Sequence, residues 1–418
     1  MQLKRNLSFL LQVFIYTLTS FGGPQVHLAM LNRIFVKKRK DLTEDELMDY
    51  YAFCQLLPGA TSTQLLGLIG YKKGGFYFSL LVLLIWIIPA CIIMCLLSFY
   101  TSEETNNLFI KRLFYYIPAM TIGFLLFTAW SLMKHKVKNL RMFSFISGSA
   151  IISTFFFKLP WIFPILILVG GILNSYLTKN KSFKQSVSTH KKPHFIFLWI
   201  FIGLFILLGT LSETARKNHW NNRTTFNLSE NFYRFGSIVF GGGDVLLPMI
   251  LDQYVARPTD SRIIQRNPNL IRLTKNEVLI GYGLVKAIPG PVFSIGSYIS
   301  SVSLQKENKS TRIIGSFIGA LSLFLPGILL MYFFFPIWQY GKKYSLISRG
   351  IEGVSLVAIG FILSAACYLF MNSDITDNKS FIYKELIFII SILCLLSYSK
   401  IPTPFIVIAT LILGILTT

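Results

Sequence analysis

The chain has 418 residues, of which 53% are hydrophobic and only 14% are charged. Its mean hydropathy of +0.58 excludes an ordinary soluble globular protein and predicts an integral membrane protein that crosses the bilayer several times. The net charge of +22 does not indicate nucleic-acid binding, because the basic residues lie in short loops between apolar segments, where they act as topology signals and contact lipid headgroups.

The first apolar segment, residues 7–31, is interrupted at Phe21-Gly-Gly-Pro24 and ends at a basic cluster in residues 33–40. Proline removes a backbone donor and glycine adopts dihedral angles that helices exclude, so a helix should break there. The basic start and the apolar run that follows it also fit a secretory signal peptide. Because the second half of the chain carries a counterpart of this segment, where no signal peptide could act, we expect a retained span.

A second interruption, Pro58-Gly59, follows a helix that we expect to start at Thr43. The pattern Leu42-Thr-Glu-Asp-Glu46 is typical of a capping box, in which the threonine caps the helix and the glutamate is its third residue. This helix should end near Leu57, and another should begin near Thr61. Each arm is shorter than the ~20 residues that cross a bilayer, which predicts a re-entrant hairpin with both ends on the cytoplasmic face.

Four further apolar segments complete the first half, at residues 76–100, 113–133, 142–157 and 161–177. Residues 178–194 are polar and basic, a composition typical of a linker. One more apolar segment follows at residues 195–211, before a polar loop at residues 212–227. The expected domains are a first repeat (1–177), a basic linker with one extra apolar segment (178–227) and a second repeat (228–418).

The second half repeats the order of motifs found in the first. Phe21-Gly-Gly corresponds to Phe240-Gly-Gly, and Leu42-Thr-x-x-Glu46 corresponds to Leu273-Thr-x-x-Glu277. At the same spacing as the second pair, Pro58-Gly59 corresponds to Pro289-Gly290. Matches that keep their order indicate a duplication, so we predict an all-α polytopic membrane protein with two homologous repeats and re-entrant or broken helices. Charge counting leaves the orientation of the second repeat open.

These motifs resemble those of the chromate ion transporter family in its long, two-domain form. The resemblance rests on Phe21-Gly-Gly-Pro24 with His27, Gln55-x-x-Pro-Gly59 with Gln64, and Phe240-Gly-Gly-Gly243 with Pro289-Gly-Pro291, and it covers nearly the whole chain. It implies export of chromate, handling of the isosteric sulfate ion, and repeats of inverted orientation. Three departures leave the exact substrate open: Ala60 stands where the second copy has the fuller Pro-Gly-Pro, Lys286 stands at the position of Gln55, and Asp244 follows the triple glycine.

A tetrahedral dianion needs several hydrogen-bond donors, little bulk around it and a positive potential. The helix starts that follow the four interruptions supply free amides and a dipole worth about half a charge. The residues expected to bind the substrate are Gly22, Gly23, Pro24, His27, Gln55, Pro58, Gly59, Thr61, Ser62, Thr63, Gln64, Gly241, Gly242, Gly243, Asp244, Lys286, Pro289, Gly290 and Pro291.

Each polar member of this set also has a purely structural interpretation. The hydroxyl residues 61–63 could only cap the second arm, and the two glutamines could face water. Lys286 could extend to an interface or pair with Asp244, which is a candidate for a coupling proton and equally for a counter-ion. His27 titrates in a range suited to proton movement, although a lone histidine near a helix end is more often structural.

The sequence therefore predicts a secondary transporter of inorganic oxyanions, with an anion channel of the same architecture as the alternative. ATP hydrolysis by this chain is disfavoured because it has no phosphate-binding loop, and a membrane enzyme or a receptor is disfavoured because it has neither a His-Glu-x-x-His nor a Gly-x-Ser-x-Gly motif. All five cysteines lie in apolar stretches without a CxxC pair, so neither a disulfide framework nor a metal site is expected. We expect no cofactor; the partners should be the oxyanion, the lipid of the plasma (inner) membrane and a second copy in a homodimer.

Overall fold

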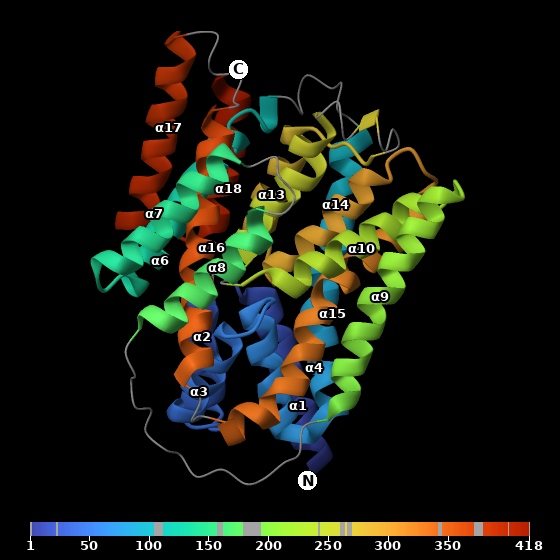
Figure 1. Ribbon diagram of the computed structural model, residues 1–418, viewed down its shortest axis with the longest axis vertical. Helices are drawn as coiled ribbons and strands as arrows, with labels where there is room; N and C mark the ends of the chain where they lie inside the picture. The colour runs from blue at the N-terminus through green and yellow to red at the C-terminus, as the bar shows by residue number, and fades with distance from the viewer. Residues whose placement is uncertain are drawn as a thin grey trace. The chain divides into compact units, whose positions relative to one another are not determined.

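The computed structural model describes residues 2–21, 24–103, 112–156, 162–178, 194–240, 243–259, 264–265, 270–341, 345–371, 379–399 and 401–417 (Figure 1). The elements in these ranges are all helices. Five of them are long and apolar enough to cross a bilayer, at Thr61–Thr101, Ile117–Lys134, Phe195–Lys217, Lys309–Trp338 and Glu352–Met371. A chain with several such helices is a multi-pass membrane protein, which confirms the prediction from composition.

The chain forms two compact units, and each unit combines segments from both halves of the sequence. Unit 1 contains Met1–Glu103, Ser188–Ile238 and Val285–Tyr340, and unit 2 contains Glu104–Val187, Val239–Leu284 and Gly341–Thr418. Helices that are distant in sequence therefore share one hydrophobic core within each unit.

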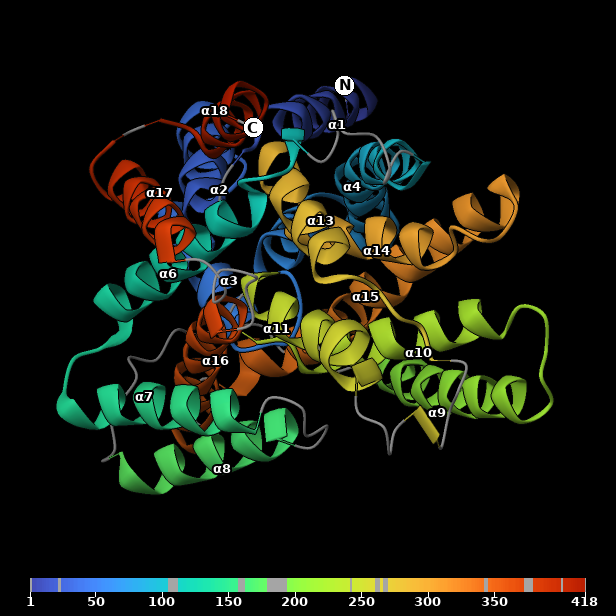
Figure 2. The ribbon, with the colours of Figure 1, turned by 90° about the horizontal axis from the view of Figure 1, so that it is seen from above.

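Unit 1 is built on two long helices, α4 (Thr61–Glu103) and α15 (Lys309–Gly341). Its other elements are α1 (Gln2–Thr19), α2 (Pro24–Leu31), the π-helix η1 (Asn32–Lys38), α3 (Glu44–Gln55), α9 (Phe195–Lys217), α10 (Arg223–Ile238), the 3-10 helix η5 (Val292–Ser294) and α14 (Ile295–Ser303). α14 lies along α4, and α10 lies beside α9 (Figures 1 and 2).

Hydroxyl groups join α14 to α4 inside the apolar core of unit 1. Ser297 donates a hydrogen bond to the Cys91 carbonyl at 2.8 Å, and Ser98 donates to the Ser301 hydroxyl at 2.6 Å. Small side chains let the two helices approach closely, and these bonds satisfy polar atoms that lipid could not solvate.

The predicted capping box at the start of α3 is confirmed. The Thr43 hydroxyl accepts a hydrogen bond from the Glu46 amide at 3.2 Å, and the Glu46 carboxylate accepts one from the Thr43 amide at 2.8 Å. α3 ends at Gln55 and α4 begins at Thr61, which also confirms the helix end near Leu57 and the start near Thr61. Local chemistry alone sets both boundaries.

α4 contains the break that we expected between a short second arm and the apolar segment at residues 76–100. Only Gly74 and Gly75 leave helical geometry, with Gly75 at φ 74° and ψ −162°. Such a positive φ strains residues with a Cβ atom, so the glycine pair divides α4 into a short arm and a long arm.

The prediction of a polar loop at residues 212–227 is wrong at both ends. α9 continues to Lys217, and α10 already begins at Arg223. Glu213 and Arg216 form an ion pair one turn apart at 2.6 Å, so polar residues here extend a helix rather than end it. Most of the expected linker, residues 179–193, lies outside the described part of the chain.

Unit 2 is organised around α16 (Ser345–Met371). The unit also contains α6 (Ile117–Lys136), α7 (Leu140–Phe155), α8 (Ile162–Leu177), the 3-10 helix η2 (Gly243–Val245), α11 (Leu246–Leu251), the π-helix η3 (Asp252–Ala256), the 3-10 helix η4 (Arg257–Thr259), most of α13 (Lys275–Ala287), α17 (Lys379–Tyr398) and α18 (Thr403–Thr417). α16 packs against α6, α7 and α8, while α17 packs on α6. Glycines at the contact of α8 and α16, among them Gly171 and Gly350, permit this close approach.

Candidate functional site

The Pro58-Gly59 interruption lies in the interior of unit 1, between α3 and α4. Pro58, Gly59 and Ala60 are all buried, and Gly59 has φ 117°. A Cβ atom at Gly59 would lie 3.0 Å from the Cα atom of Gly327 in α15, so both the backbone angle and the space require glycine. The interruption therefore rests directly on the backbone of a long helix.

Gln64, on the first turn of α4, fastens this interruption to α15. Its Nε2 atom donates to the Pro58 carbonyl at 2.8 Å and to the Gly327 carbonyl at 2.9 Å. Because both partners can only accept, the amide nitrogen must face them. The two amide hydrogens that we expected to reach the substrate are thus bonded to backbone oxygens.

We call Pro58-Gly59 the first interruption of this site and Pro289-Gly290, which follows α13 and precedes η5, the second interruption. Gly290 has φ 119°, close to the angle of Gly59, and its amide donates to the Ser20 carbonyl at 3.1 Å. A Cβ atom at Gly290 would lie 2.8 Å from the Cβ atom of Ala90 in α4. This interruption therefore meets the residue that follows α1 and also rests on the other long helix.

His27 belongs to a buried aromatic cluster that joins α1, α2 and α4. Its Nδ1 atom lies 3.2 Å from the Tyr16 hydroxyl, and its ring meets the Trp86 ring edge-on with centroids 5.5 Å apart. Trp86 donates from Nε1 to the Thr63 hydroxyl at 3.0 Å. The structure thus brings His27 and Thr63 together through Trp86. Tyr16 and Trp86 were missed from sequence, since an aromatic residue in an apolar run usually indicates packing.

Most of the remaining predicted residues lie next to the two interruptions in sequence. Thr61 is buried, while Gln55 and Ser62 are half-buried. Lys286 is also half-buried, in the last turn of α13, and Pro291 is the residue that precedes η5. Pro24 begins α2. Gly22, Gly23, Gly241 and Gly242 lie outside the described residues.

Asp244 and Gly243 lie in η2 of unit 2. The Asp244 carboxylate accepts a hydrogen bond from the Tyr282 hydroxyl at 2.7 Å, and both side chains are buried. A buried carboxylate needs such a partner, because an unpaired charge is strongly disfavoured in an apolar interior. Sequence analysis did not include Tyr282 in the site.

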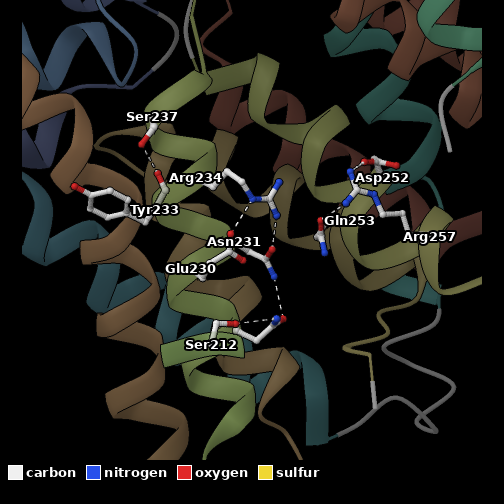
Figure 3. A network of polar contacts seen from close by, with 10 residues as sticks. Ser212, Glu230, Asn231, Tyr233, Arg234, Ser237, Asp252, Gln253 and Arg257 are labelled. Atoms are coloured by element: carbon white, nitrogen blue, oxygen red, sulfur yellow. Dashed lines mark hydrogen bonds and ion pairs between the residues drawn. The ribbon is translucent and has the colours of Figure 1, made fainter. Parts of the chain in front are cut away.

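A second buried carboxylate of unit 2 lies in the π-helix η3. Asp252, which is only 2% exposed, pairs with Arg257 at 2.5 Å, and Arg257 also donates to the Gln253 side chain at 2.8 Å (Figure 3). Insertions of π-geometry into helices are frequent at functional sites. Sequence analysis treated Arg257 only as a topology signal, because its partner could not be read from spacing.

The same figure draws a separate polar network on α10 in unit 1. Arg234 donates to the Glu230 carboxylate at 2.9 Å and to the Asn231 side chain at 2.5 Å (Figure 3). Asn231 in turn donates to Asn227 at 3.0 Å, and Asn227 donates to Ser212 of α9 at 3.4 Å. This network joins two helices and satisfies their polar side chains, so it stabilises unit 1.

Comparison with known proteins gives a family. The profile of the chromate transporter family matches residues 7–175 and 226–415. The chain is 24% identical to a "probable chromate transport protein" of Synechococcus elongatus (95% of this chain, 91% of the relative) and 22% identical to the "chromate transport protein" of Cupriavidus metallidurans (94% and 89%). The uncharacterized transporter YwrA of Bacillus subtilis is 22% identical over 39% of this chain and 94% of its own length. No solved structure matches the chain significantly.

Proposed function

Because the chain belongs to the chromate transporter family, whose members are membrane transporters rather than enzymes, we propose that it is a secondary transporter that exports inorganic oxyanions. Chromate is the proposed substrate, and sulfate, which has the same tetrahedral shape and charge, is the proposed competitor. The names of the relatives from Synechococcus elongatus and Cupriavidus metallidurans support chromate.

The proposal includes two homologous repeats, residues 1–177 and 228–418, joined by residues 178–227. The two segments matched by one family profile support it, as does a relative that is about as long as one segment. Structural features recur at the corresponding positions: the capping box of Thr43 recurs at Thr274, and the positive φ of Gly59 recurs at Gly290. π-Helices also occur at corresponding places, as η1 and η3. Inverted orientation of the repeats follows from the family resemblance.

The observation that carries the proposed binding mode is that two helix interruptions lie in unit 1, with Pro58, Gly59 and Gly290 buried. Each interruption precedes a helix start, and the amides of a first helical turn lack partners within their own helix. Together with the helix dipole, such starts attract anions. Interrupted helices at membrane depth are tolerated where they face protein, water or a substrate, and transporters use them for this purpose.

Individual residues receive different roles in this proposal. Thr61 and Ser62 donate hydroxyl hydrogen bonds at the start of α4, and Lys286 supplies a positive charge beside the second interruption. A lysine at bilayer depth is disfavoured by ~2.5 to 3.5 kcal/mol, which is consistent with a retained function. Gln64 positions the first interruption instead of binding the anion. Asp244, paired with Tyr282, carries the coupling proton.

Uptake into inverted membrane vesicles tests the proposed substrate. Vesicles that contain the protein should accumulate labelled chromate faster than vesicles without it, and unlabelled sulfate should compete. Nitrate, which is planar and singly charged, should not compete. Accumulation equal to that of the control vesicles would contradict oxyanion transport, and equal competition by nitrate would contradict a site shaped for tetrahedral dianions.

A further inference from the structure

The first turn after the second interruption contains a buried hydroxyl that no predicted site includes. Ser294 closes η5 and is the N-cap residue of α14, and its side chain is 0% exposed. Its Oγ atom has no hydrogen-bond partner in the described part of the chain. Buried hydroxyl groups are nearly always hydrogen-bonded, so this atom requires an explanation.

The local backbone limits how the helix can satisfy this hydroxyl. An N-cap side chain bonds a later amide when its own backbone is extended, but Ser294 has helical angles of φ −61° and ψ −11° and makes no cap bond. A serine inside a helix can instead donate to the carbonyl four residues earlier. For Ser294 that residue is Gly290, which lies in the interruption at φ 119° and not in a helix.

The surroundings of the turn offer apolar contacts. Ala90 faces Gly290, Leu323 faces Gly296, and the ring of Phe324 lies 5.6 Å from that of Phe293. None of these three side chains can form a hydrogen bond. The buried Ser294 hydroxyl thus lies directly after a helix interruption, in a turn whose neighbouring residues contact these apolar side chains.

The corresponding position of the first interruption differs in one respect. The spacing that relates Gly59 to Gly290 also relates Thr63 to Ser294. The Thr63 hydroxyl accepts a hydrogen bond from Trp86 at 3.0 Å. The spacing that relates Pro89 to Pro326 relates Trp86 to Leu323, which cannot donate a hydrogen bond from its side chain. The described part of the chain therefore provides a partner for the first hydroxyl and none for the second.

We propose that Ser294 is a substrate-binding residue whose hydroxyl donates to a tetrahedral oxyanion at the start of α14. The inference rests on the proposed function, and it adds to that function a specific donor at the second interruption. The Thr63 hydroxyl, oriented by Trp86, has a structural role instead. A charged acceptor strengthens such a bond, so its loss should change affinity measurably.

Replacement of Ser294 by alanine tests this assignment in purified, reconstituted protein. Ser294→Ala should raise the KM for chromate uptake about tenfold, the change expected when one hydrogen bond to a charged ligand is lost. It should also raise the thermal midpoint of the substrate-free protein, because it removes an unsatisfied buried polar atom. Addition of chromate should then shift that midpoint less than in the unaltered protein. Ser294→Thr, which keeps the hydroxyl, should retain a KM near the original value.

Ser300→Ala is the matched control. Ser300 is equally buried on α14, and its Oγ atom is also without a partner in the described residues. The residue four positions earlier, Gly296, is helical, so its carbonyl can accept a hydrogen bond from the Ser300 hydroxyl after rotation of the Ser300 side chain. The KM of the Ser300→Ala variant should not change.

Three results would overturn the assignment: an unchanged KM in Ser294→Ala, equal changes of KM in both alanine variants, or a lowered thermal midpoint of Ser294→Ala with a normal KM. If the unaltered protein moves no oxyanion, the proposed function fails as well; normal flux with an unaffected Ser294→Ala variant contradicts only this inference.

Discussion

At the scale of single residues, two glycines determine the geometry of the proposed site. Gly59 and Gly290 share a backbone conformation that residues with a Cβ atom rarely adopt, and each faces a long helix at a distance that leaves no room for a side chain. Their place beside a proline made the interruptions predictable from sequence. The partners of the interruptions were not predictable, because Gly327 and Ala90 are remote in the chain.

Substitution of Gly59 by alanine should destabilise the protein by roughly 1–3 kcal/mol, the usual range for a strained backbone position. Gly148→Ala is the matched control, since Gly148 lies within α7 and a Cβ atom there would meet nothing within 4 Å. That control should be neutral or stabilising by up to ~1 kcal/mol. Thermal unfolding in detergent measures both. A Gly59→Ala variant with the midpoint of the unaltered protein would show that the tight contact with α15 is absent.

The proposed roles of Lys286 and Thr61 predict losses of transport without losses of folded protein. Lys286→Ala and Thr61→Val should each lower kcat/KM for chromate about tenfold or more, as expected when a contact to a charged ligand is removed. The exposed Lys37 provides the control, because Lys37→Ala makes the same change of charge far from both interruptions in sequence. Normal kcat/KM in either variant would remove that residue from the site.

Sequence reasoning identified some site residues and missed others for physical reasons. Prolines and glycines interrupt a helix, and a lysine or aspartate next to such an interruption is conspicuous, so these residues were identified, whereas the buried pair of Asp252 and Arg257 was missed. Ser294 and Trp86 are ordinary residues of apolar segments, and only the contacts around them distinguish their roles. For Ser294 the decisive fact is that its hydroxyl has no partner among the described residues, which no sequence pattern can show.

At the scale of elements, α3 and the short arm of α4 are held together at their ends by Glu46. This side chain completes the capping box of α3 and also forms an ion pair with Lys72 at 2.6 Å. Partial burial raises the pKa of Glu46, but hydrogen bonds from Lys72 and Thr43 and the charge of Lys72 together lower it below its usual value. The carboxylate therefore stabilises the folded state when it is ionised.

The pH dependence of this pair has a definite sign. Because the pKa of Glu46 is lower in the folded protein, the stabilisation is complete above the ordinary pKa near 4.5 and is lost as pH falls below it. Glu46→Gln keeps a capping box but removes the charge, so it should cost at most ~1 kcal/mol at neutral pH, as expected for partly exposed pairs. The difference in thermal stability between Glu46→Gln and the unaltered protein should disappear as the pH falls below that value.

Lys72→Gln, which removes the other charge of the pair, should cost a similar amount at neutral pH. Thermal midpoints measured from pH 7 to pH 3 that show a constant difference would contradict the ion pair.

Helix starts with local signals were predictable, whereas helix continuations were not. Thr43 and Glu46 determine the start of α3, and Pro58 determines its end. By contrast, residues 212–217 looked like a loop because they are polar, yet they continue α9 through an ion pair of its own. The π-geometry of η1 and η3 also has no local signal that sequence analysis used, since it depends on packing around the helix.

At the scale of the whole molecule, composition predicted the membrane setting and the order of motifs predicted the family. Both conclusions rest on features averaged over many residues, which explains why they were accessible without coordinates. The assembly of each unit from both halves of the sequence was not accessible, because it depends on contacts such as that between Gln64 and Gly327. Such contacts leave no trace in spacing.

The central claim is that this chain binds a tetrahedral oxyanion at buried helix interruptions and carries it across the bilayer. Counterflow in proteoliposomes tests it most directly: vesicles loaded with unlabelled chromate should take up labelled chromate faster than empty vesicles, with rates that saturate. The Ser294→Ala and Lys286→Ala variants should need more chromate to reach half-maximal exchange. Flux that rises linearly with concentration, with single-channel currents and no stimulation by internal chromate, would instead show a channel and contradict the account.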